Sequence, residues 1–596
     1  MMMHRSFYSL GLTALLAVAA CSEAEPIGPG DGGPLVDAAT PMDTGDPCSQ
    51  ENMQSDPDNC GSCGNRCVLF GADAVCEEGA CGLGACRAGY VDLNGDPSDG
   101  CEYQCEVTDP LDPIDELGRD ENCDGFDGLL SQLIFVSPSG DDGADGSQAE
   151  PVASFAAALE LVEPEGNRRA IVIAEGTYSL DGIGQVPAGV SLHGGFRNDG
   201  RWTRDAEARA TFGETVAPLV IGGGSGVTIE GLELSTQSRD VDRDGPGAAA
   251  VGLVIRNGTG VRGHNLIVRA GQGSDGVAGR PGLDGAVGGN GGRGGNGCED
   301  SSGICDSCDR PRGGTGGSSP CGSSGGAGGT PGKGEGNGSA GASGAPGLGE
   351  AAEGFPEGEN GAGGAAGQAG GGFQSGGQGG VGATGAAGTD GAGGAEAGRF
   401  EELTYQPASG EAGGVGGAGG GGAGGGGGGG GGRGWACDRY GGAAGGGGGG
   451  GCGGTGGGAG SGGGASVALL VLSGSPQLTL STFTTLGGGA GAPGALGGLG
   501  GAGGDGGDGG NRSDDSGAGG TGGNGGDGGL GGTGGSGGGG PSIGVWLADG
   551  SQGQVASCIF ELGRGGEGGL GATRSQDAEP VNSGAAGLSV SVYSAP

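Results

Sequence analysis

The sequence predicts a mainly β fold, a parallel β-helix with glycine-rich inserts, and two observations lead to that prediction. An eight-residue apolar pattern occurs four times, with a shorter apolar run ahead of each copy. Glycine-rich segments of very different length leave the pattern at the same point each time. Units that bury their apolar faces only against their neighbours are typical of solenoids, and insertions then stack along one edge. The four copies are residues 227–234, 261–268, 478–485 and 555–562.

The four copies can be aligned on their shared apolar positions. Each copy has an apolar residue at its first and sixth positions. The first positions are Val227, Val261, Leu478 and Val555. The preceding runs begin at Leu219, Leu253 and Leu470, and the fourth run, one residue longer, lies around Trp546. The alignment predicts β-helix segments at 134–270, 466–486 and 542–562, with a final strand at 584–596.

Composition and charge narrow the classes of function. The chain has 596 residues, of which 173 are glycine, and a formal net charge of -44. An acidic surface of this kind repels nucleic acids and anionic membrane surfaces, and no basic patch interleaved with aromatic residues offsets it. Nucleic-acid binding is therefore excluded.

The first twenty residues have the features of a secretory signal peptide. Basic residues precede an apolar run at 10–18 that is too short to span a bilayer. The phrase Val18-Ala19-Ala20-Cys21 resembles the lipobox of bacterial lipoproteins, which implies cleavage before Cys21 and acylation of that residue. By analogy with that class, Ser22 implies sorting to the outer membrane of a Gram-negative cell. The alternative is an ordinary cleaved signal with an incidental cysteine.

A tether and a cysteine-rich module follow. Residues 21–47 are rich in Pro, Gly, Asp and Ala, which predicts a flexible tether. Residues 48–128 form an acidic module whose phrases at 59–67 and 89–102 resemble a module at the front of bacterial surface lipoproteins. Its end at 120–128 is similar to the Cys- and Asp-rich repeats called putative metal-binding motifs.

The cysteines indicate an oxidising compartment. Apart from Cys21, they fall in even local groups, and Cys558 is left over as a buried, unreactive thiol. The group from 298 to 321 could hold zinc through four thiolates, but secretion favours two disulfides. Cys437 and Cys452 bracket a glycine run that a bond between them would staple. The disulfide candidates are Cys48, Cys60, Cys63, Cys67, Cys76, Cys81, Cys86, Cys101, Cys105, Cys123, Cys298, Cys305, Cys308, Cys321, Cys437 and Cys452.

The segment from 134 to 270 begins the predicted β-helix. Phe155, Leu159 and Val162 fall at helical spacing behind Pro151, which predicts a short capping helix over 151–162. This order of helix and apolar runs resembles the pectate-lyase-like right-handed parallel β-helix proteins. The resemblance implies a right-handed coil whose open end is covered by a helix, which protects strand edges from association.

The glycine-rich inserts occupy 271–465, 487–541 and 563–583. Glycine holds every third position from 273 to 297, but scarce proline and broken phase disfavour a collagen helix. Two interpretations stay open. Extended three-per-turn glycine strands could bond laterally as in polyglycine II, or the tracts could stay disordered because glycine loses the most entropy on folding. The composition is similar to the PGRS domains of PE_PGRS surface proteins, although the PE domain is absent.

Two groups of acidic side chains are candidate calcium ligands. Asp240, Asp242 and Asp244 precede Gly245 and resemble the first half of a calcium loop. Val251 holds the twelfth position, which excludes an EF-hand. The alternative is a polar turn. A second, weaker candidate consists of Asp92, Asn94, Asp96 and Asp99.

No catalytic cluster is evident in the sequence. Polysaccharide lyases and hydrolases need clustered carboxylates, or calcium with a basic residue, on one exposed face. The outward positions of the copies include Glu230 and His264, but no copy stacks Asp on Asp beside a facing Arg or Lys. His193 and His264 are expected at the surface or in turns.

These observations predict a lipid-anchored cell-surface protein with a structural or adhesive role and no enzymatic activity. Its expected partners are the membrane, through the lipid anchor, and glycans, matrix or other cells. Calcium is the only cofactor that the sequence suggests. The alternative is a divergent carbohydrate-binding or polysaccharide-processing β-helix protein.

Overall fold

The computed structural model divides the chain into two compact units. It describes residues 49–115, 118–163, 166–300, 305, 307–347, 358–432, 437–548, 550–574, 580 and 582–595. The units are Met1–Glu106 and Val107–Pro596. The boundary falls before the expected end of the cysteine-rich module at 128, because Phe126 packs its ring on Phe135 and Phe196 of the second unit. Cys21 and Cys48 lie outside the described residues.

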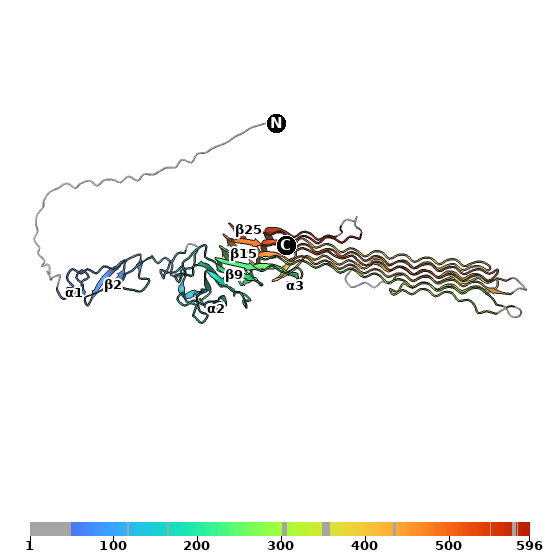
Figure 1. The fold of residues 1–596 in the computed structure, drawn as a ribbon, viewed down its shortest axis with the longest axis horizontal. Helices are drawn as coiled ribbons and strands as arrows, with labels where there is room; N and C mark the ends of the chain where they lie inside the picture. Colours follow the sequence, from blue (N-terminus) through green and yellow to red (C-terminus); the bar gives the residue numbers. More distant parts are fainter. Residues whose placement is uncertain are drawn as a thin grey trace, which may run out of the picture. The chain divides into compact units, whose positions relative to one another are not determined.

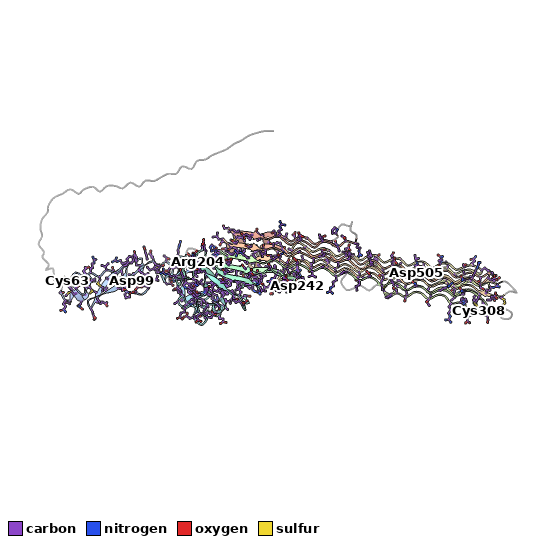
Figure 2. All side chains as sticks on the ribbon, viewed as in Figure 1. Cys63, Asp99, Arg204, Asp242, Cys308 and Asp505 are labelled. Atoms are coloured by element: carbon purple, nitrogen blue, oxygen red, sulfur yellow. A yellow bond between two sulfur atoms is a disulfide. The ribbon has the colours of Figure 1, made fainter. Side chains whose placement is uncertain are left out.

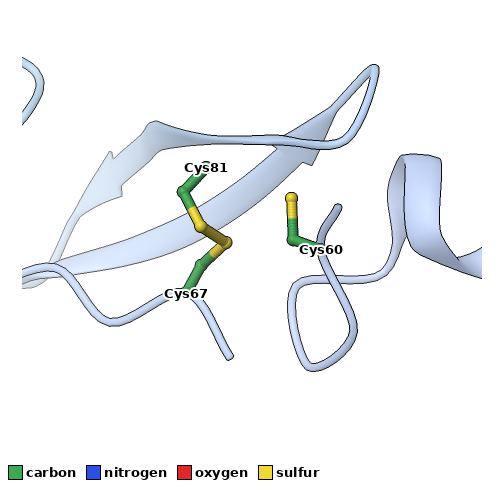
Figure 3. A group of neighbouring side chains, drawn as sticks. All are labelled: Cys60, Cys67 and Cys81. Atoms are coloured by element: carbon green, nitrogen blue, oxygen red, sulfur yellow. A yellow bond between two sulfur atoms is a disulfide. The ribbon is translucent and has the colours of Figure 1, made fainter. Parts of the chain in front are cut away.

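The first unit is small and held by disulfides. Its strands β1 (Ala72–Glu77) and β2 (Ala80–Cys86) pair antiparallel, and so do β3 (Tyr90–Val91) and β4 (Tyr103–Gln104). The helix α1 (Asn52–Ser55) precedes them. Disulfides join Cys60 to Cys76, Cys67 to Cys81 and Cys86 to Cys101. Figure 3 shows the Cys67–Cys81 bond beside Cys60.

The second unit is mainly β and contains three parallel sheets, which we call the three-sheet stack (Figure 1). The five-stranded sheet has the order β10 (Leu219–Ile221), β13 (Ala250–Ile255), β20 (Ser466–Val471), β23 (Ser542–Leu547) and β26 (Ser589–Ser594). The seven-stranded sheet has the order β24 (Gln554–Ala556), β21 (Gln477–Thr479), β14 (Arg262–His264), β11 (Thr228–Glu230), β8 (Ser191–Phe196), β6 (Ala170–Ala174) and β5 (Leu133–Val136). The six-stranded sheet has the order β25 (Ile559–Leu562), β22 (Thr482–Thr485), β15 (Ile267–Ala270), β12 (Leu232–Thr236), β9 (Ala210–Thr215) and β7 (Gly176–Tyr178).

The chain visits the three sheets in a fixed order. Strands β10, β11 and β12 are followed by β13, β14 and β15, then by β20, β21 and β22, and then by β23, β24 and β25. Every insert therefore leaves after a strand of the six-stranded sheet and returns to the five-stranded sheet. The predicted common exit corner of the inserts is confirmed.

The register corrects the sequence alignment of the copies. Leu478 pairs with Gly263 rather than Val261, which shifts the third copy by two residues. Because side chains alternate with a period of two, this shift keeps the same face inward, and apolarity alone could not detect it. The run in β20 shifts by one residue, since Leu469, not Leu470, pairs with Leu253. All six residues of β20 are buried, so its sequence does not show which side chains point to the core of the stack and which to the other face of the sheet.

The core runs through the stack as columns of aligned apolar residues. Leu234, Val268 and Phe483 are aligned across successive strands and are at most 2% exposed. The expected capping helix forms as α2 (Phe155–Glu160), which packs against the end strand β5. It begins after Ser154 rather than at Pro151, because the Ser154 hydroxyl accepts the N–H of Ala157 at 3.1 Å.

The remaining elements are short. The 3-10 helix η1 (Leu130–Gln132) leads into β5, and α3 (Val241–Asp244) lies in the first insert. Two small antiparallel pairs belong to the long insert. They are β16 (Cys298–Glu299) with β19 (Arg439–Tyr440), and β17 (Arg399–Glu401) with β18 (Thr404–Gln406).

The glycine-rich tracts form a hydrogen-bonded assembly, which we call the glycine array: the described residues of 271–465, 487–541 and 563–588 (Figure 1). Bonds recur at every third residue along neighbouring tracts. The N–H groups of Gly276, Gly279 and Gly282 donate to the carbonyls of Ala490, Pro493 and Leu496 at 2.8 to 3.0 Å. The backbone groups of the array are therefore satisfied by neighbouring tracts, as buried backbone groups require.

Glycine content follows the number of neighbours that a tract contacts. Residues 416–432 are buried without interruption, and every residue there is glycine or alanine. In tract 517–540, by contrast, an exposed residue such as Thr521, Asn524 or Asp527 occurs at every third position, and the two residues between are glycine. In the outer tract 273–297, every third residue from Gly273 donates its N–H to one neighbouring tract, and Gly289, Gly292 and Gly295 donate theirs to a second. Where this second neighbour is present, glycine holds two of every three positions. Side chains are thus confined to faces that point to solvent.

Three consecutive glycines of the central tract illustrate this constraint. Their N–H groups donate to three different tracts, at Gly445, Gly377 and Ser339, over 2.8 to 3.0 Å. A Cβ on any of them would clash with a carbonyl oxygen of a neighbouring tract. The clashing pairs are Gly425 with Gly520, Gly426 with Gln368 and Gly427 with Thr330.

Exposed polar side chains complete the hydrogen bonding at the surface of the array. Asp275 accepts the N–H of Ala490 at 2.7 Å, and Asp284 accepts that of Leu499 at 2.7 Å. Asn290 accepts the N–H of Asp505 at 2.9 Å in the same way. Part of the acidic charge of the chain therefore serves to satisfy backbone donors that face solvent.

We predict that a single methyl group distinguishes central from peripheral glycines. Gly426→Ala should lower the free energy of unfolding by about 1–3 kcal/mol, because the added Cβ overpacks against a backbone that cannot yield. Gly371→Ala is the matched control, since its nearest contact is the flexible Gln374 side chain at 3.4 Å. The control should be neutral or stabilising by up to about 1 kcal/mol. Thermal and denaturant unfolding measure both, and equal losses would contradict this packing.

Candidate functional site

The outer face of the seven-stranded sheet carries two columns of polar side chains. His193, Glu230, His264 and Thr479 occupy aligned positions on β8, β11, β14 and β21. The adjacent column contains Thr228, Arg262 and Gln477. Ile229, between Thr228 and Glu230, is fully buried in the core, which places its two neighbours on the outer face. We call this face, with Arg204, the polar cleft.

A buried ion network lies at the centre of the polar cleft. Glu230 Oε1 lies 2.7 Å from His193 Nδ1, and Glu230 Oε2 lies 2.9 Å from Arg204 Nη2. Glu230 and His193 are each only 4% exposed. The Arg204 guanidinium also lies over the Phe196 ring, 5.2 Å from its centroid. A carboxylate this deeply buried is tolerated because both oxygens have cationic or hydrogen-bonding partners.

The network sets the protonation state of Glu230. Burial alone would raise the pKa of its carboxyl. The hydrogen bond and charge of His193 and the charge of Arg204 outweigh burial, and the pKa of Glu230 is lowered. Glu230 is therefore a structural anion at neutral pH rather than a proton donor.

The pKa of Asp127 is shifted in the opposite direction to that of Glu230. Its Oδ2 lies 3.5 Å from Arg204 Nη1, and its Oδ1 accepts the N–H of Asp115 at 3.0 Å. Burial raises the pKa of Asp127 to about 7, although the Asp115 N–H and the Arg204 charge act against the rise. Asp127 therefore exchanges a proton near neutral pH.

Three adjoining cavities lie along the polar cleft. The largest, about 480 Å³, lies between Pro113 and Ile114 on one side and Ser191, His193 and Arg262 of the sheet on the other. The other two, of about 440 and 420 Å³, both border Glu230 and His264. Segment 111–115 thus lies beside two of the cavities, and the sheet provides their rigid wall.

The chemistry of the polar cleft favours binding of a polar ligand. His264 Nδ1 lies 3.0 Å from the Thr479 hydroxyl, and its ring borders two of the cavities. A glycosidase needs an accessible carboxylic acid of raised pKa beside a second carboxylate. Glu230 has a lowered pKa, and Asp127, whose pKa is raised, is 7% exposed. Arginine, imidazole, hydroxyl and amide groups along two columns suit hydrogen bonding to a hydroxyl-rich chain.

This site was not predicted from the sequence. His193, expected at the surface or in a turn, is buried within β8, because Glu230 supplies it with a buried hydrogen-bond partner. Glu230 and His264 share the fourth position of the first two copies, and that shared position was the available signal. Nothing in the sequence indicated that Arg204 or Asp127 would join them.

The residues of the first predicted calcium group lie in one turn, where Asp244 Oδ2 accepts the N–H of Asp240 at 3.0 Å. Asp240 Oδ1 accepts the N–H of Asp242 at 2.9 Å and caps α3. Asp244 pairs with Arg243 at 2.9 Å and with Arg239 at 3.6 Å, so its charge is already compensated. Three groups of metal-ligating side chains within 4.8 Å occur in the described part of the chain, and neither predicted calcium site is among them. These aspartates serve as a cap and as ion-pair partners.

The second predicted calcium group forms turn hydrogen bonds. Asp92 accepts the N–H of Gly95 at 2.8 Å, and Asp96 accepts that of Ser98 at 2.9 Å. Asn94 donates to Asp99 at 3.0 Å. Short polar side chains stabilise tight turns in this way.

Another acidic group gathers near the phrase that resembles metal-binding motifs. Carboxylate oxygens of Asp112, Asp120 and Asp124 lie within 4.8 Å of one another. Asp112, which is buried, accepts the N–H groups of Glu121 at 3.0 Å and Gly128 at 2.9 Å. Asp120 accepts two further N–H groups, so backbone donors already organise this loop.

The disulfides of the long insert differ from the expected local pairing. Cys298 bonds to Cys308, but Cys305 bonds to Cys437 and Cys321 to Cys452. The four cysteines from 298 to 321 therefore do not pair only with one another, and Cys437 and Cys452 are not joined to each other. The reason is tertiary, since β16 at Cys298 pairs with β19 at Tyr440 and brings distant tracts together. These bonds also occupy the thiols that a zinc site would need.

Two of these disulfides lie at the end of the array far from the polar cleft. Figure 2 labels Cys308 at that end and Arg204 on the three-sheet stack. Ion pairs accompany them: Lys333 with Asp300 at 2.8 Å, and Arg439 with Glu299 at 3.3 Å. We call these residues with Cys298, Cys305, Cys308 and Cys437 the array tip.

No family model, curated protein or solved structure matches this chain. None of the helices in the described part of the chain has the length and apolarity needed to cross a membrane.

We predict that Asp127 makes stability depend on pH. The folded state holds its proton up to about pH 7, whereas the unfolded state releases it near pH 3.8, so the folded state binds more protons between these values. The free energy of unfolding should therefore fall as pH rises from 4 to 7, by up to about 4 kcal/mol at 1.36 kcal/mol per pKa unit. Asp127→Asn should remove this fall and raise the melting temperature at pH 8.

Asp205 provides the control for this prediction. The pKa of Asp205 is lowered, first by the N–H of Glu207 and then by Arg197, so its charged form is the stabilising one. Asp205→Asn should reduce the melting temperature at pH 8 and have little effect below pH 4. Identical melting profiles for the unmodified chain and Asp127→Asn from pH 4 to 8 would show that Asp127 titrates normally.

Proposed function

We propose that this chain is a lipid-anchored cell-surface protein with a structural and adhesive role. In this proposal a right-handed parallel β-helix supports a stiff array of polyglycine II helices that holds a contact surface away from the membrane. The observation that carries it is the hydrogen bonding of the central tract, whose successive N–H groups bond to three different neighbours. A lattice bonded in three directions resists bending in a way that a single glycine chain does not.

The β-helix interpretation is supported by the repeated order of the strands. From β10 to β26 the chain passes through the five-, seven- and six-stranded sheets in the same order, and the sheets are parallel. A right-handed coil is the usual hand when parallel strands are connected within one sheet.

The polyglycine II interpretation is supported by the three-residue repeat of the bonds. Gly276, Gly279 and Gly282 form one series, and the series continues through Gly297. At about 3.1 Å per residue, a tract from 273 to 297 would extend about 75 Å. That reach would place the array tip well beyond the three-sheet stack.

Anchoring rests on the amino-terminal sequence. The lipobox-like phrase ending at Cys21 lies outside the described residues, and the tether 21–47 would follow it. Several acyl chains on one cysteine provide stable attachment, since each buried methylene contributes about 0.8 kcal/mol. The disulfides of both units suit a location outside the cytoplasm.

The array tip is the part of the array best suited to contact. Its disulfides and its ion pairs with Lys333 and Arg439 join the described ends of neighbouring tracts. A fixed surface loses less entropy on binding than a mobile one. Contact with other cells or matrix would therefore occur there.

The test compares adhesion of cells that display the chain. Cells with the unmodified chain should adhere to matrix or to one another more than cells with Cys21→Ser, which should release the protein and fail to incorporate labelled palmitate. Gly426→Ala, which overpacks the array, should reduce adhesion, while Gly371→Ala should preserve it. Undiminished adhesion of cells that have released the Cys21→Ser protein would reject the adhesive role, and so would equal adhesion for the unmodified chain, Gly426→Ala and Gly371→Ala at equal amounts of displayed protein.

A second candidate function is glycan binding in the polar cleft. Its supporting observation is the pair of polar columns along four strands, where Thr228, Arg262 and Gln477 line the same cavity. Adjacent strands lie about 4.8 Å apart, which allows a linear chain of hydroxyl groups to be met at successive strands. Binding here is compatible with a structural role for the array.

Binding to immobilised bacterial and plant polysaccharides tests this second function. Arg262→Ala should reduce the affinity at least about tenfold, because a charge-assisted hydrogen bond is lost. Arg269→Ala removes another exposed arginine, from the six-stranded sheet, and should leave binding unchanged. Absence of retention on every polysaccharide, or equal losses in both variants, would reject the polar cleft as a glycan site.

A further inference from the structure

His193 has a ring nitrogen that the ion network of the polar cleft does not use. The residue is 4% exposed, and its Nδ1 lies 2.7 Å from Glu230 Oε1. Among the residues that the structure describes, no group forms a hydrogen bond with the other nitrogen, Nε2. An unpaired polar atom in a buried ring is costly, and it indicates a partner that completes the hydrogen bonding.

Glu230 fixes which nitrogen of a neutral His193 ring carries the hydrogen. Arg204 holds the Glu230 carboxylate in place, with Nη2 2.9 Å from Oε2. An ionised carboxylate can only accept hydrogen bonds, so the neutral imidazole donates its Nδ1–H to Glu230. Nε2 then has a lone pair and no hydrogen, which makes it an acceptor.

The His193 ring borders the largest cavity of the polar cleft. This cavity of about 480 Å³ also borders Ser191, Thr228 and Arg262 on the same sheet. Its volume is within the range of about 300–1,000 Å³ that is typical of small-ligand pockets. Strand β8, which carries His193, lies between β6 and β11 in the seven-stranded sheet. The acceptor nitrogen is therefore held on a rigid element, as a selective binding site requires.

The wall of this cavity that faces the sheet is largely apolar. Leu111, Pro113 and Ile114 of segment 111–115 border the cavity. Leu111 is 67% exposed, so part of an apolar side chain faces solvent there. A sugar ring has the matching character, because its faces carry C–H groups and its edge carries hydroxyl groups. An apolar wall opposite a few fixed polar groups is typical of ligand pockets.

We propose that His193 Nε2 accepts a hydrogen bond from a hydroxyl group of a sugar ring that enters this cavity with one face against segment 111–115. The inference rests on the second candidate function, glycan binding in the polar cleft, and specifies the hydroxyl-bearing ring as the unit that is recognised. Glu230 and Arg204 are positioning residues, because they hold the imidazole and its tautomer. A ligand without a hydroxyl at this point leaves a buried acceptor unpaired and is discriminated against.

The variant His193→Asn separates the acceptor from the ion network. The asparagine Nδ2 takes the place of Nδ1 and can still donate to Glu230, whereas no atom takes the place of Nε2. On immobilised polysaccharides that retain the unmodified chain, His193→Asn should lower the affinity at least about tenfold, because the ligand hydroxyl loses its acceptor. Its melting temperature should stay close to that of the unmodified chain. His193→Ala, which also removes the donor to Glu230, should lower both the affinity and the melting temperature.

Nuclear magnetic resonance of the chain with ¹⁵N-labelled histidine gives a second measurement, and its first part needs no ligand. The chain has three histidines, and the signals that disappear in His193→Asn are those of His193. Nδ1 of His193 should carry the hydrogen and Nε2 should not. Oligosaccharides prepared from a retained polysaccharide should then shift the Nε2 resonance upfield, as expected when this nitrogen accepts a hydrogen bond.

The outcomes separate this role of His193 from glycan binding itself. A hydrogen on Nε2 instead of Nδ1 would overturn the role of His193. Equal affinity of the unmodified chain and His193→Asn for a retained polysaccharide would also overturn it, while glycan binding in the polar cleft would stand. Retention on no polysaccharide would reject the second candidate function and this inference with it.

Discussion

The close approach of backbones in the glycine array is the constraint on which most of this structure depends. Tracts that bond through their own N–H and C=O groups leave no room for a Cβ, as the contact of Gly426 with Gln368 illustrates. In the described part of the array, Phe400 and Tyr405 of β17 and β18 pack on Trp546 of the stack. The cohesion of the glycine tracts comes from hydrogen bonds that each contribute about 0.5–1.5 kcal/mol net. Many such bonds must form together to offset the entropy that glycine loses on ordering.

The three-sheet stack holds the ends of the glycine tracts in positions where their backbones can form these hydrogen bonds. Its strands fix the points where each insert leaves and returns, between Ala270 and Ser466 and between Thr485 and Ser542. Loop ends that are already held in place reduce the entropy cost of ordering the tracts between them. Bonds such as Cys321–Cys452 join tracts again far along the array. The stack and the array are therefore one cooperative system, in which apolar burial positions the hydrogen-bonded part.

Only part of the polar cleft could be predicted from the pattern of side chains in the repeated copies. The outward positions of Glu230 and His264 were evident from their shared place in the repeated copies, and the structure aligns them as partners on adjacent strands. Arg204 and Asp127 come from segments outside the repeat, and no periodicity links them to Glu230. The burial that raises the pKa of Asp127 and the partners that lower that of Glu230 exist only after these segments pack together.

Whether the glycine tracts bond laterally or stay disordered was open from the sequence. The repeated apolar strands and the common exit of the inserts could be predicted from it. These features are local, because each depends on the type and spacing of residues in one stretch of chain. Tertiary packing sets the strand register and the Cys305–Cys437 and Cys321–Cys452 pairings. A shift of two residues preserves the facing of every side chain, and cysteines more than a hundred residues apart meet only when tracts align. Such choices depend on which distant segments become neighbours, and that information is not contained in any single stretch of the sequence.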